Sequence, residues 1–212
     1  MLEEGRSHIR FVELEQEGEF RMKPDSKWLP FTARQHFSTT PPGFIWDARI
    51  RMAPLLDVRV VDMYSNGRGG LLAKLGGAFT VARESGGKEL DTGELMRYLA
   101  ETVWFPAALL PSPHLKWEPI DENCAMAVLS DSGYEARLQF EFNDRGEIIR
   151  SSGERHLRLD GTYRKMNWIG SYSDYQLRDG MRIPMRASVS WSVTEGEWNY
   201  WRGRVTQVQY RP

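Results

Sequence analysis

Apolar and polar residues alternate along most of this chain, and that alternation predicts many antiparallel strands. The segment ARLQFEF at 136–142 is the clearest case, because every second residue is apolar. The Asn-Asp-Arg-Gly turn after it leads into a second strand-like segment at 147–159, as in a β-hairpin. Further hairpins are predicted around turns at 130–133, 178–180 and 194–197. Strands are also predicted at 8–22, 31–38, 43–52 and 57–64.

One segment has clear helical periodicity. Its apolar face is predicted to consist of Leu95, Met96, Leu99 and Val103. The helix is predicted to begin at Asp91 as N-cap, with Glu94 completing a capping box, and to stop or kink at Pro106. A second, weaker helix or turn is predicted at 69–79. The pattern therefore predicts an α+β, mainly β fold in a single domain of residues 1–212, with one or two helices packed on an antiparallel sheet.

Composition narrows the class of protein. The 212 residues are 41% hydrophobic and 27% charged, with a net charge of -1, so no basic excess suggests a nucleic-acid partner. The only cysteine, Cys124, rules out an internal disulfide framework. No apolar run approaches the ~20 residues that a spanning helix requires, and the polar start MLEEGRSHIR does not resemble a signal peptide. We expect a soluble, cytoplasmic chain, and a natural membrane anchor upstream of it is the alternative.

The motifs of common cofactor and metal sites are missing from the sequence. The four histidines at 8, 36, 114 and 156 share no metal-ligand spacing. A Walker loop, a dinucleotide fingerprint and a GxSxG elbow are also missing, and NGRGG at 66–70 fits a turn better than a phosphate cradle. The sequence thus predicts neither a metal nor a cofactor.

The strand at 57–64 contains an unexpected carboxylate. If Arg59 faces water, Asp62 and Tyr64 face the opposite, apolar side of the sheet. A buried carboxylate must be paired or protonated, so Asp62 could act as a general acid or base or orient a polar ligand group. The structural alternative, which is commoner, is an aspartate that pairs with an arginine or caps the following turn.

The predicted helix carries a polar stripe of Glu94, Arg97, Glu101 and Trp104. On an exposed face, the pair of Arg97 and Glu101 would contribute only about 0.2–0.5 kcal/mol. Trp104, one turn further on, suggests instead that the stripe is covered. If the sheet curls over the helix, Glu101 lies between core and cavity, and both interpretations stay open.

Aromatic residues are the strongest compositional feature, with eight Trp, eight Tyr and nine Phe. Such side chains suit either a core or a pocket for an apolar ligand. Core packing is the default, but a fraction of them could line a pocket. The candidate ligand-binding residues are Trp46, Tyr64, Arg97, Trp104, Trp117, Tyr175 and Trp191.

The motifs RYLAETVWFP at 97–106 and YWRGR at 200–204, together with DYQLRDGMRIP, resemble a bacterial family known only as a domain of unknown function. The resemblance covers about residues 9–210 and is most specific over 97–117. In that family the domain often follows an N-terminal helix or membrane segment, and no catalytic residues are established. More weakly, the pattern is similar to the half-barrel fold of LolA and LppX, in which a curled antiparallel sheet encloses helices around an apolar cavity. This likeness implies a lipid or other apolar ligand, and the fold also hosts a cofactor-free enzyme of violacein biosynthesis.

Three functions follow as hypotheses. The first is binding of a hydrophobic or lipid-like molecule in an aromatic-lined half-barrel cavity of ~300–1,000 Å³, with Asp62 or Glu101 orienting its polar end. The second is a cofactor-independent isomerase, hydratase or lyase in which Glu101 and Asp62 serve as acid and base. The third is an interaction module whose aromatic strands at 191–210 pair with a partner.

Overall fold

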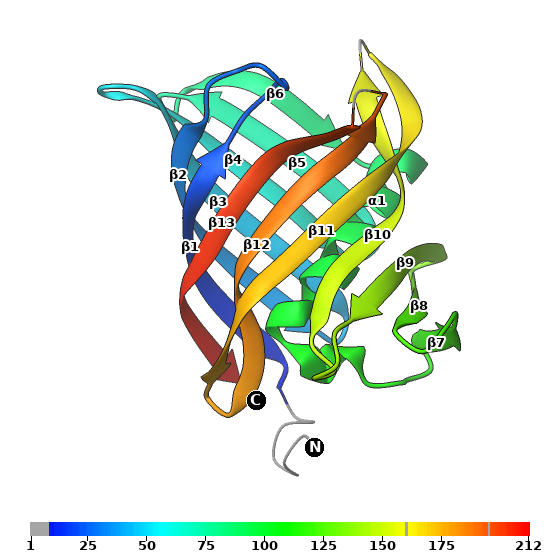
Figure 1. Cartoon of the computed structure of the whole chain (residues 1–212). Coiled ribbons are helices and arrows are strands. Elements are labelled where there is room, and N and C mark those ends of the chain that lie inside the picture. The colour runs from blue at the N-terminus through cyan, green and yellow to red at the C-terminus, as the bar shows by residue number, and fades with distance from the viewer. Residues whose placement is uncertain (1–8, 160, 195) are drawn as a thin grey trace.

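The computed structural model describes residues 9–159, 161–194 and 196–212, which form thirteen strands, one α-helix and two short 3-10 helices (Figure 1). The first strands are β1 (Phe11–Phe20), β2 (Leu29–Thr39), β3 (Pro42–Ala53), β4 (Leu56–Ser65), β5 (Arg68–Leu75) and β6 (Phe79–Ser85). The helical segment comprises α1 (Lys88–Glu101), η1 (Thr102–Trp104) and η2 (Pro106–Leu109). The remaining strands are β7 (Leu115–Pro119), β8 (Cys124–Asp131), β9 (Tyr134–Phe142), β10 (Ile148–Leu159), β11 (Thr162–Arg178), β12 (Met181–Val193) and β13 (Gly196–Arg211).

All thirteen strands belong to one antiparallel sheet with the order β6-β5-β4-β3-β2-β1-β13-β12-β11-β10-β9-β8-β7. The first and last strands pair with each other, so the two halves of the chain meet in the middle of the sheet. The sheet curls around α1 without closing into a barrel (Figure 1). The predicted mainly β fold, a curled antiparallel sheet with a helix on its concave side, is therefore confirmed.

Helix α1 joins the two arms of the sheet. The Asp91 carboxylate accepts hydrogen bonds from the backbone N–H of Gly69 on β5, at 2.7 Å, and from the hydroxyl of Tyr134 on β9, at 3.0 Å. The predicted apolar face of the helix is buried, from Leu95 to Val103. The helix thus takes the place that strand pairing between the two arms would fill in a closed barrel.

Two local predictions were wrong. The N-cap is Gly87 rather than Asp91, which lies inside the first turn and accepts a hydrogen bond from the Gly87 backbone N–H at 3.2 Å. The helix or turn predicted at 69–79 is instead most of β5, the turn after it and the first residue of β6, because β5 pairs with β4 along the length of β5. Glycine at position 69 also eases the close approach of α1, since a Cβ there would lie 3.0 Å from Glu94 Cγ.

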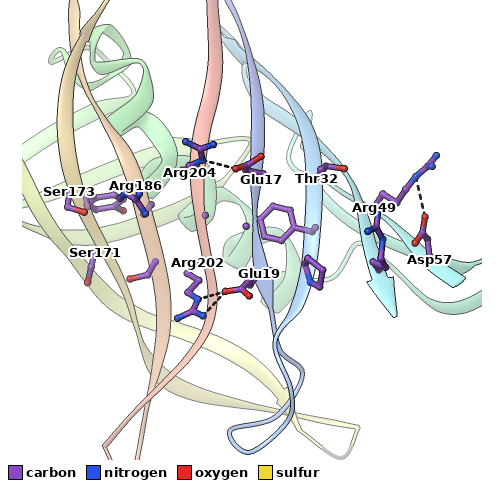
Figure 2. Close-up of a pocket in the computed structure, with 18 residues that line it drawn as sticks. Glu17, Glu19, Thr32, Arg49, Asp57, Ser171, Ser173, Arg186, Arg202 and Arg204 are labelled. Atoms are coloured by element: carbon purple, nitrogen blue, oxygen red, sulfur yellow. Dashed lines mark hydrogen bonds and ion pairs between the residues drawn. The ribbon is translucent and has the colours of Figure 1, made fainter. Parts of the chain in front are cut away.

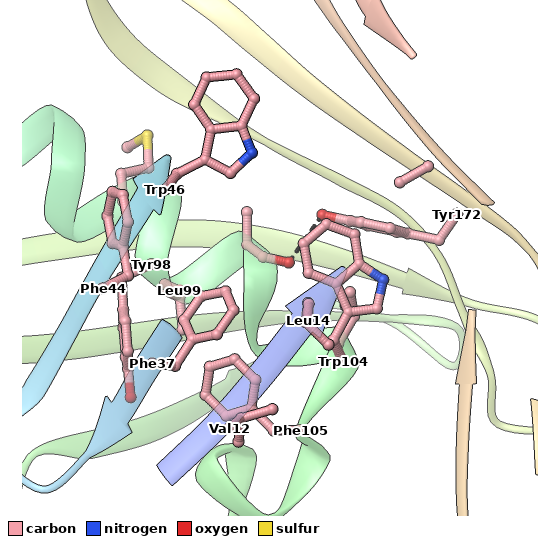
Figure 3. Close-up of a cluster of buried hydrophobic side chains, with 14 of the residues drawn as sticks. Val12, Leu14, Phe37, Phe44, Trp46, Tyr98, Leu99, Trp104, Phe105 and Tyr172 are labelled. Carbon is pink, nitrogen blue, oxygen red and sulfur yellow. Dashed lines mark hydrogen bonds between the residues drawn. The ribbon is translucent and has the colours of Figure 1, made fainter. Parts of the chain in front are cut away.

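The apolar core lies around the C-terminal half of α1, near the chain termini. Phe37, Tyr98 and Phe105 pack as a group, with ring centroids 4.6–6.4 Å apart (Figure 3). Phe44 joins them from β3 at 6.3 Å from Phe37. Helix α1 itself ends at Glu101, before Pro106, and Trp104 belongs to the short helix η1.

The hairpins β1–β2, β3–β4 and β5–β6 all turn at the end of the sheet opposite to the described termini (Figure 1). We call this end the hairpin end, and the end that holds the Phe37 group the terminal end. The same antiparallel order places the β10–β11 and β12–β13 turns at the hairpin end as well.

Candidate functional site: a buried polar layer beneath an aromatic cluster

Polar side chains interrupt the interior in one cross-strand row. Gln35 lies opposite Trp46, and Trp46 lies opposite Asp62, so adjacent strands place all three at the same height. The alternation of apolar and polar residues places each of the three on the inward face of the sheet, and each is at most 8% exposed. The next row toward the terminal end, which begins at Phe37, is aromatic, so the polar row borders the core.

Arg97 reaches this row from α1. Its guanidinium binds the Asp62 carboxylate through Nη1 and donates from Nε to Glu101 Oε1 at 2.9 Å. Gln35 Nε2 donates to the other Glu101 oxygen at 2.6 Å. The guanidinium also lies over the rings of Phe44 and Trp46, with centroids 4.8 and 5.2 Å away. The arginine is thus held by two carboxylates and two aromatic faces.

A second buried ion pair lies one helical turn earlier. Arg155 on β10 donates from Nη2 to Glu94 Oε1 at 2.7 Å, and the two side chains are 11% and 5% exposed. Its guanidinium stacks 4.9 Å from the Trp168 ring. We define the polar layer as Gln35, Asp62, Glu94, Arg97, Glu101 and Arg155.

The polar layer contains three carboxyls and two guanidiniums, so one carboxyl must hold a proton for the layer to be neutral. The pKa of Glu94 is raised to about 7, chiefly by burial and then by the neighbouring Asp62, against the opposing effects of Arg155 and Arg97. Burial also raises the pKa of Asp62 and Glu101, although Arg97 opposes both shifts. Burial alone would lower the pKa of Arg97, but the carboxylates of Glu101, Asp62 and Glu94 together raise it, so Arg97 stays charged.

Three acceptor atoms of the polar layer lack a hydrogen-bond donor within the described part of the chain. Asp62 Oδ1, Glu94 Oε2 and Gln35 Oε1 are buried and have no hydrogen-bond partner among the described residues. A buried acceptor without a partner is destabilising by about 1–3 kcal/mol, so three together call for a donor. That donor can be a proton on a carboxyl or a hydrogen-bonding group of a bound molecule.

An aromatic cluster adjoins the polar layer on the side of the hairpin end. Tyr200 is its centre: the ring stacks on Trp191 at 6.3 Å, and Trp198 and Phe20 lie 5.9 and 6.1 Å away. Trp168 Nε1 donates to the Tyr200 hydroxyl at 3.0 Å. Because Trp168 also stacks on Arg155, the cluster and the polar layer are in direct contact.

The cluster is not sealed from solvent. Trp168 and Trp191 are buried, whereas Phe20, Trp198 and Tyr200 are half-buried although they pack against the core. Trp198 Nε1 is a buried donor without a partner among the described residues. The cluster therefore presents accessible aromatic surface next to a layer that has free acceptors, and it contains one buried indole N–H that lacks a partner among the described residues.

The structure brings four of the predicted site residues together, and they are Trp46, Asp62, Arg97 and Glu101. Asp62 and Glu101 meet through Arg97, so Glu101 pairs with the arginine inside the protein rather than in water. The Trp46 indole donates to Gln16 Oε1 at 3.0 Å and packs beside the layer. Trp191 belongs to the aromatic cluster.

The other four predicted ligand-binding residues lie elsewhere. Tyr64 donates its hydroxyl to Asp131 at 2.7 Å, and Trp104 donates its indole N–H to the Pro184 carbonyl at 3.0 Å. Trp117 packs on Phe140 and Phe142, and Tyr175 donates to the carbonyl of Ile148 at 2.7 Å. Each of these four side chains has a hydrogen-bond or ring-packing partner outside the polar layer and the aromatic cluster, and that partner accounts for its position.

The hollows on the outer face of the sheet differ from the expected apolar cavity. The larger groove, of about 850 Å³, is open and is lined by residues of β1, β2, β3, β11, β12 and β13 and by Asp57 of β4 (Figure 2). Cross-strand ion pairs lie along it, such as Arg204 with Glu17 at 2.7 Å and Arg202 with Glu19 at 2.6 Å. A second groove of about 640 Å³ lies on the same face, and neither is lined by Asp62 or Glu101.

Sequence reasoning missed Gln35, Arg155 and the cluster residues Phe20, Trp168, Trp198 and Tyr200 as members of the site, and it missed Gln16, which binds Trp46 beside the polar layer. The glutamines could have been found, because Gln35 continues the alternation of Phe31 and Ala33, the pattern that placed Asp62 inside. Arg155 carries no such signal in its own strand.

The described residues contain no group of three or more His, Cys, Asp or Glu side chains arranged to hold a metal ion. Within the same described ranges, no helix is both long and apolar enough to cross a bilayer.

Comparison with known proteins assigns a family. The family of unknown function DUF6920 matches residues 1–210, so the chain belongs to this family. No curated protein matches the chain. Among solved structures, it is similar to a DUF1329 family protein from Desulfovibrio piger, with 12% identity, a TM-score of 0.49, and coverage of 96% of this chain and 86% of that one. It is also similar to a LolA superfamily protein from Nitrosomonas europaea, with 10% identity, a TM-score of 0.45 and the same coverage.

Proposed function

We propose that this member of the DUF6920 family binds an apolar molecule on the concave face of its sheet. The apolar part of the ligand packs on the half-buried aromatic residues Phe20, Trp198 and Tyr200. Its polar group donates hydrogen bonds to the free acceptors of the polar layer, Asp62 Oδ1 and Glu94 Oε2. The observation that carries the proposal is this pairing of accessible aromatic surface with buried acceptors that lack partners.

The chemistry of the polar layer restricts the polar group. Arg97 and Arg155 are already held by carboxylates, so a phosphate or carboxylate would have to compete with those ion pairs. Free acceptors instead favour a neutral or cationic donor, such as a hydroxyl, an amide or an amine. We therefore expect a ligand with an apolar body and a hydrogen-bond-donating end.

Acid–base catalysis is a second candidate, and one observation favours it. Glu94 is buried in the polar layer, and burial is the main reason that its pKa is raised to about 7, a value suited to proton transfer near neutral pH. Asp62 and Glu101 are less suited to the role given to them above, because both bind Arg97. In this alternative Glu94 exchanges the proton, and the same aromatic surface holds the substrate.

The test is to identify what the purified protein retains. Native mass spectrometry, followed by solvent extraction and mass analysis, should find an apolar compound with a donor group. Trp198→Ala should lower the retained amount. The matched control is Trp28→Ala, because Trp28 stacks on Arg21 and Arg202 away from the polar layer. If the protein retains no compound, or if both variants retain as much as the wild type, the binding proposal is wrong.

A further inference from the structure

Exposed apolar side chains are concentrated at the hairpin end. Of the thirteen large hydrophobic residues that are exposed among the described residues, six belong to three neighbouring hairpins. They are Met22 in β1–β2, Met52, Leu55 and Leu56 in β3–β4, and Phe79 and Val81 in β5–β6. Leu55 is fully exposed, Phe79 is 75% exposed and Met22 is 64% exposed. Single exposed apolar residues scattered over a surface need no explanation. Here three adjacent hairpin tips each carry at least one such residue, which indicates an interaction surface.

The backbone of the β3–β4 turn shows that the fold does not require a leucine at its tip. Ala53 pairs with Leu56, so Pro54 and Leu55 form a two-residue turn. Leu55 has a φ of 63°, and a proline followed by a residue with positive φ is the pattern of a type II turn. That second position favours glycine or asparagine, because a larger side chain is strained there. The leucine therefore serves something other than the turn.

The same three tips are basic, whereas the whole chain is not. Residues 21–28, 51–57 and 74–79 contain five basic and two acidic side chains, a net charge of +3, while the chain carries -1. Lys23 and Lys27 follow Met22 in the first hairpin, and Lys74 lies next to the last residue of β5. Apolar tips surrounded by positive charge match the interface of a bilayer with anionic lipids.

We propose that the hairpin end docks on an anionic lipid bilayer, with Met22, Leu55 and Phe79 inserted into the headgroup region. Neighbouring hairpins are two strands apart in the sheet, so adjacent tips are separated by about 10 Å and three tips define one contact plane. Lys23, Lys27 and Lys74 pair with lipid phosphates beside the inserted side chains. The docking surface does not depend on the binding proposal above, although the aromatic cluster lies on the side of the polar layer that faces the same end of the sheet.

The test is cosedimentation of the full chain with vesicles of phosphatidylcholine, with and without phosphatidylglycerol. The wild type should bind the anionic vesicles. Leu55→Asn should weaken binding about tenfold, because it removes one side chain that would otherwise leave water. Asparagine suits the left-handed position, so this variant should fold at least as well as the wild type. The matched control is Leu177→Asn, since Leu177 is 65% exposed in the β11–β12 hairpin at the terminal end and should not affect binding.

Charge variants complete the test. Changing Lys23, Lys27 and Lys74 to glutamine should weaken binding to anionic vesicles by about fivefold per lysine. Failure of the wild type to bind anionic vesicles would overturn the proposal and would point to a protein partner for these tips. Equal effects of Leu55→Asn and Leu177→Asn would overturn it too. Neither result bears on the retained ligand, which is measured without vesicles.

Discussion

Replacing Glu94 with glutamine should change the stability of the protein, relative to the wild type, in a pH-dependent way: the variant should gain on the wild type as the pH rises from acid to neutral. Glu94 is buried, pairs with Arg155 through one oxygen and leaves the other oxygen without a partner among the described residues. Burial is the main reason that its pKa rises from 4.5 to about 7. Glutamine keeps the shape and the acceptor for Arg155 but carries no charge at any pH, so the variant isolates the ionisation of this one carboxyl.

The sign of the effect follows from proton binding. Between pH 4.5 and about 7 the folded protein holds a proton on Glu94 that the unfolded chain has lost, so the wild type loses stability as the pH rises. Each pH unit in that window changes the free energy of unfolding by about 1.4 kcal/mol, or roughly 3 kcal/mol over the whole window. Below pH 4.5 the carboxyl is neutral in both states. The stability of Glu94→Gln relative to the wild type should therefore increase across the window and be constant below it.

Urea denaturation at several pH values from 4 to 8, followed by tryptophan fluorescence, measures this difference. The control is Glu118→Gln, which removes an exposed carboxylate that pairs with Arg137 at 2.5 Å. Its stability should follow the wild type within about 1 kcal/mol at every pH, because exposed ion pairs contribute little. If the difference in unfolding free energy between Glu94→Gln and the wild type does not change with pH, Glu94 has an ordinary pKa in the folded protein. That result would refute the inference that one carboxyl of the polar layer holds a proton near neutral pH.

Three further variants test other contacts. Arg97→Met leaves its two buried carboxylate partners without a cation and should cost about 3–5 kcal/mol at neutral pH but less in acid; a loss below about 1 kcal/mol in urea denaturation would contradict it. Asp91→Ala removes the acceptor of three hydrogen bonds, one from the helix N-cap Gly87 and two that join α1 to the two arms, and should cost about 2–4 kcal/mol, with faster hydrogen exchange of the Gly69 amide as the local readout. Gly18→Ala would place a Cβ 2.2 Å from a backbone oxygen and should lower the melting temperature, whereas Gly70→Ala meets a flexible side chain at 3.4 Å and should lower it much less.

The sheet was predictable because its signals are local. In β9, Ala136, Leu138 and Phe140 alternate with polar residues, and all three are buried. The same reasoning placed Asp62 and Tyr64 inside from the position of Arg59, and both are buried. A strand has a period of two, so a single residue of known direction fixes the direction of all the others.

The wrong predictions involve contacts between distant parts of the chain. Asp91 has the residue type and spacing of an N-cap, but its carboxylate binds Gly69 and Tyr134 on opposite arms of the sheet. The apolar run at 71–75 fits a short helix as well as a strand, and pairing with β4 decides between them. Arg155 lies 61 residues from Glu94, and the sequence of β10 gives no sign that it turns inward.

The pair of Arg97 and Glu101 shows why composition and spacing could not decide between surface and site. As a sequence pattern it is an ordinary pair of charges one helical turn apart, with an expected contribution of about 0.2–0.5 kcal/mol. In the structure the same two side chains are only 14% and 15% exposed, and Asp62 and Gln35 from two other strands bind them. Loss of one partner from such a buried network costs several kcal/mol, because the remaining charge has no water to solvate it. Curling of the sheet over the helix therefore changes the energy scale of the pair about tenfold, and that curl depends on strand pairing across the whole chain.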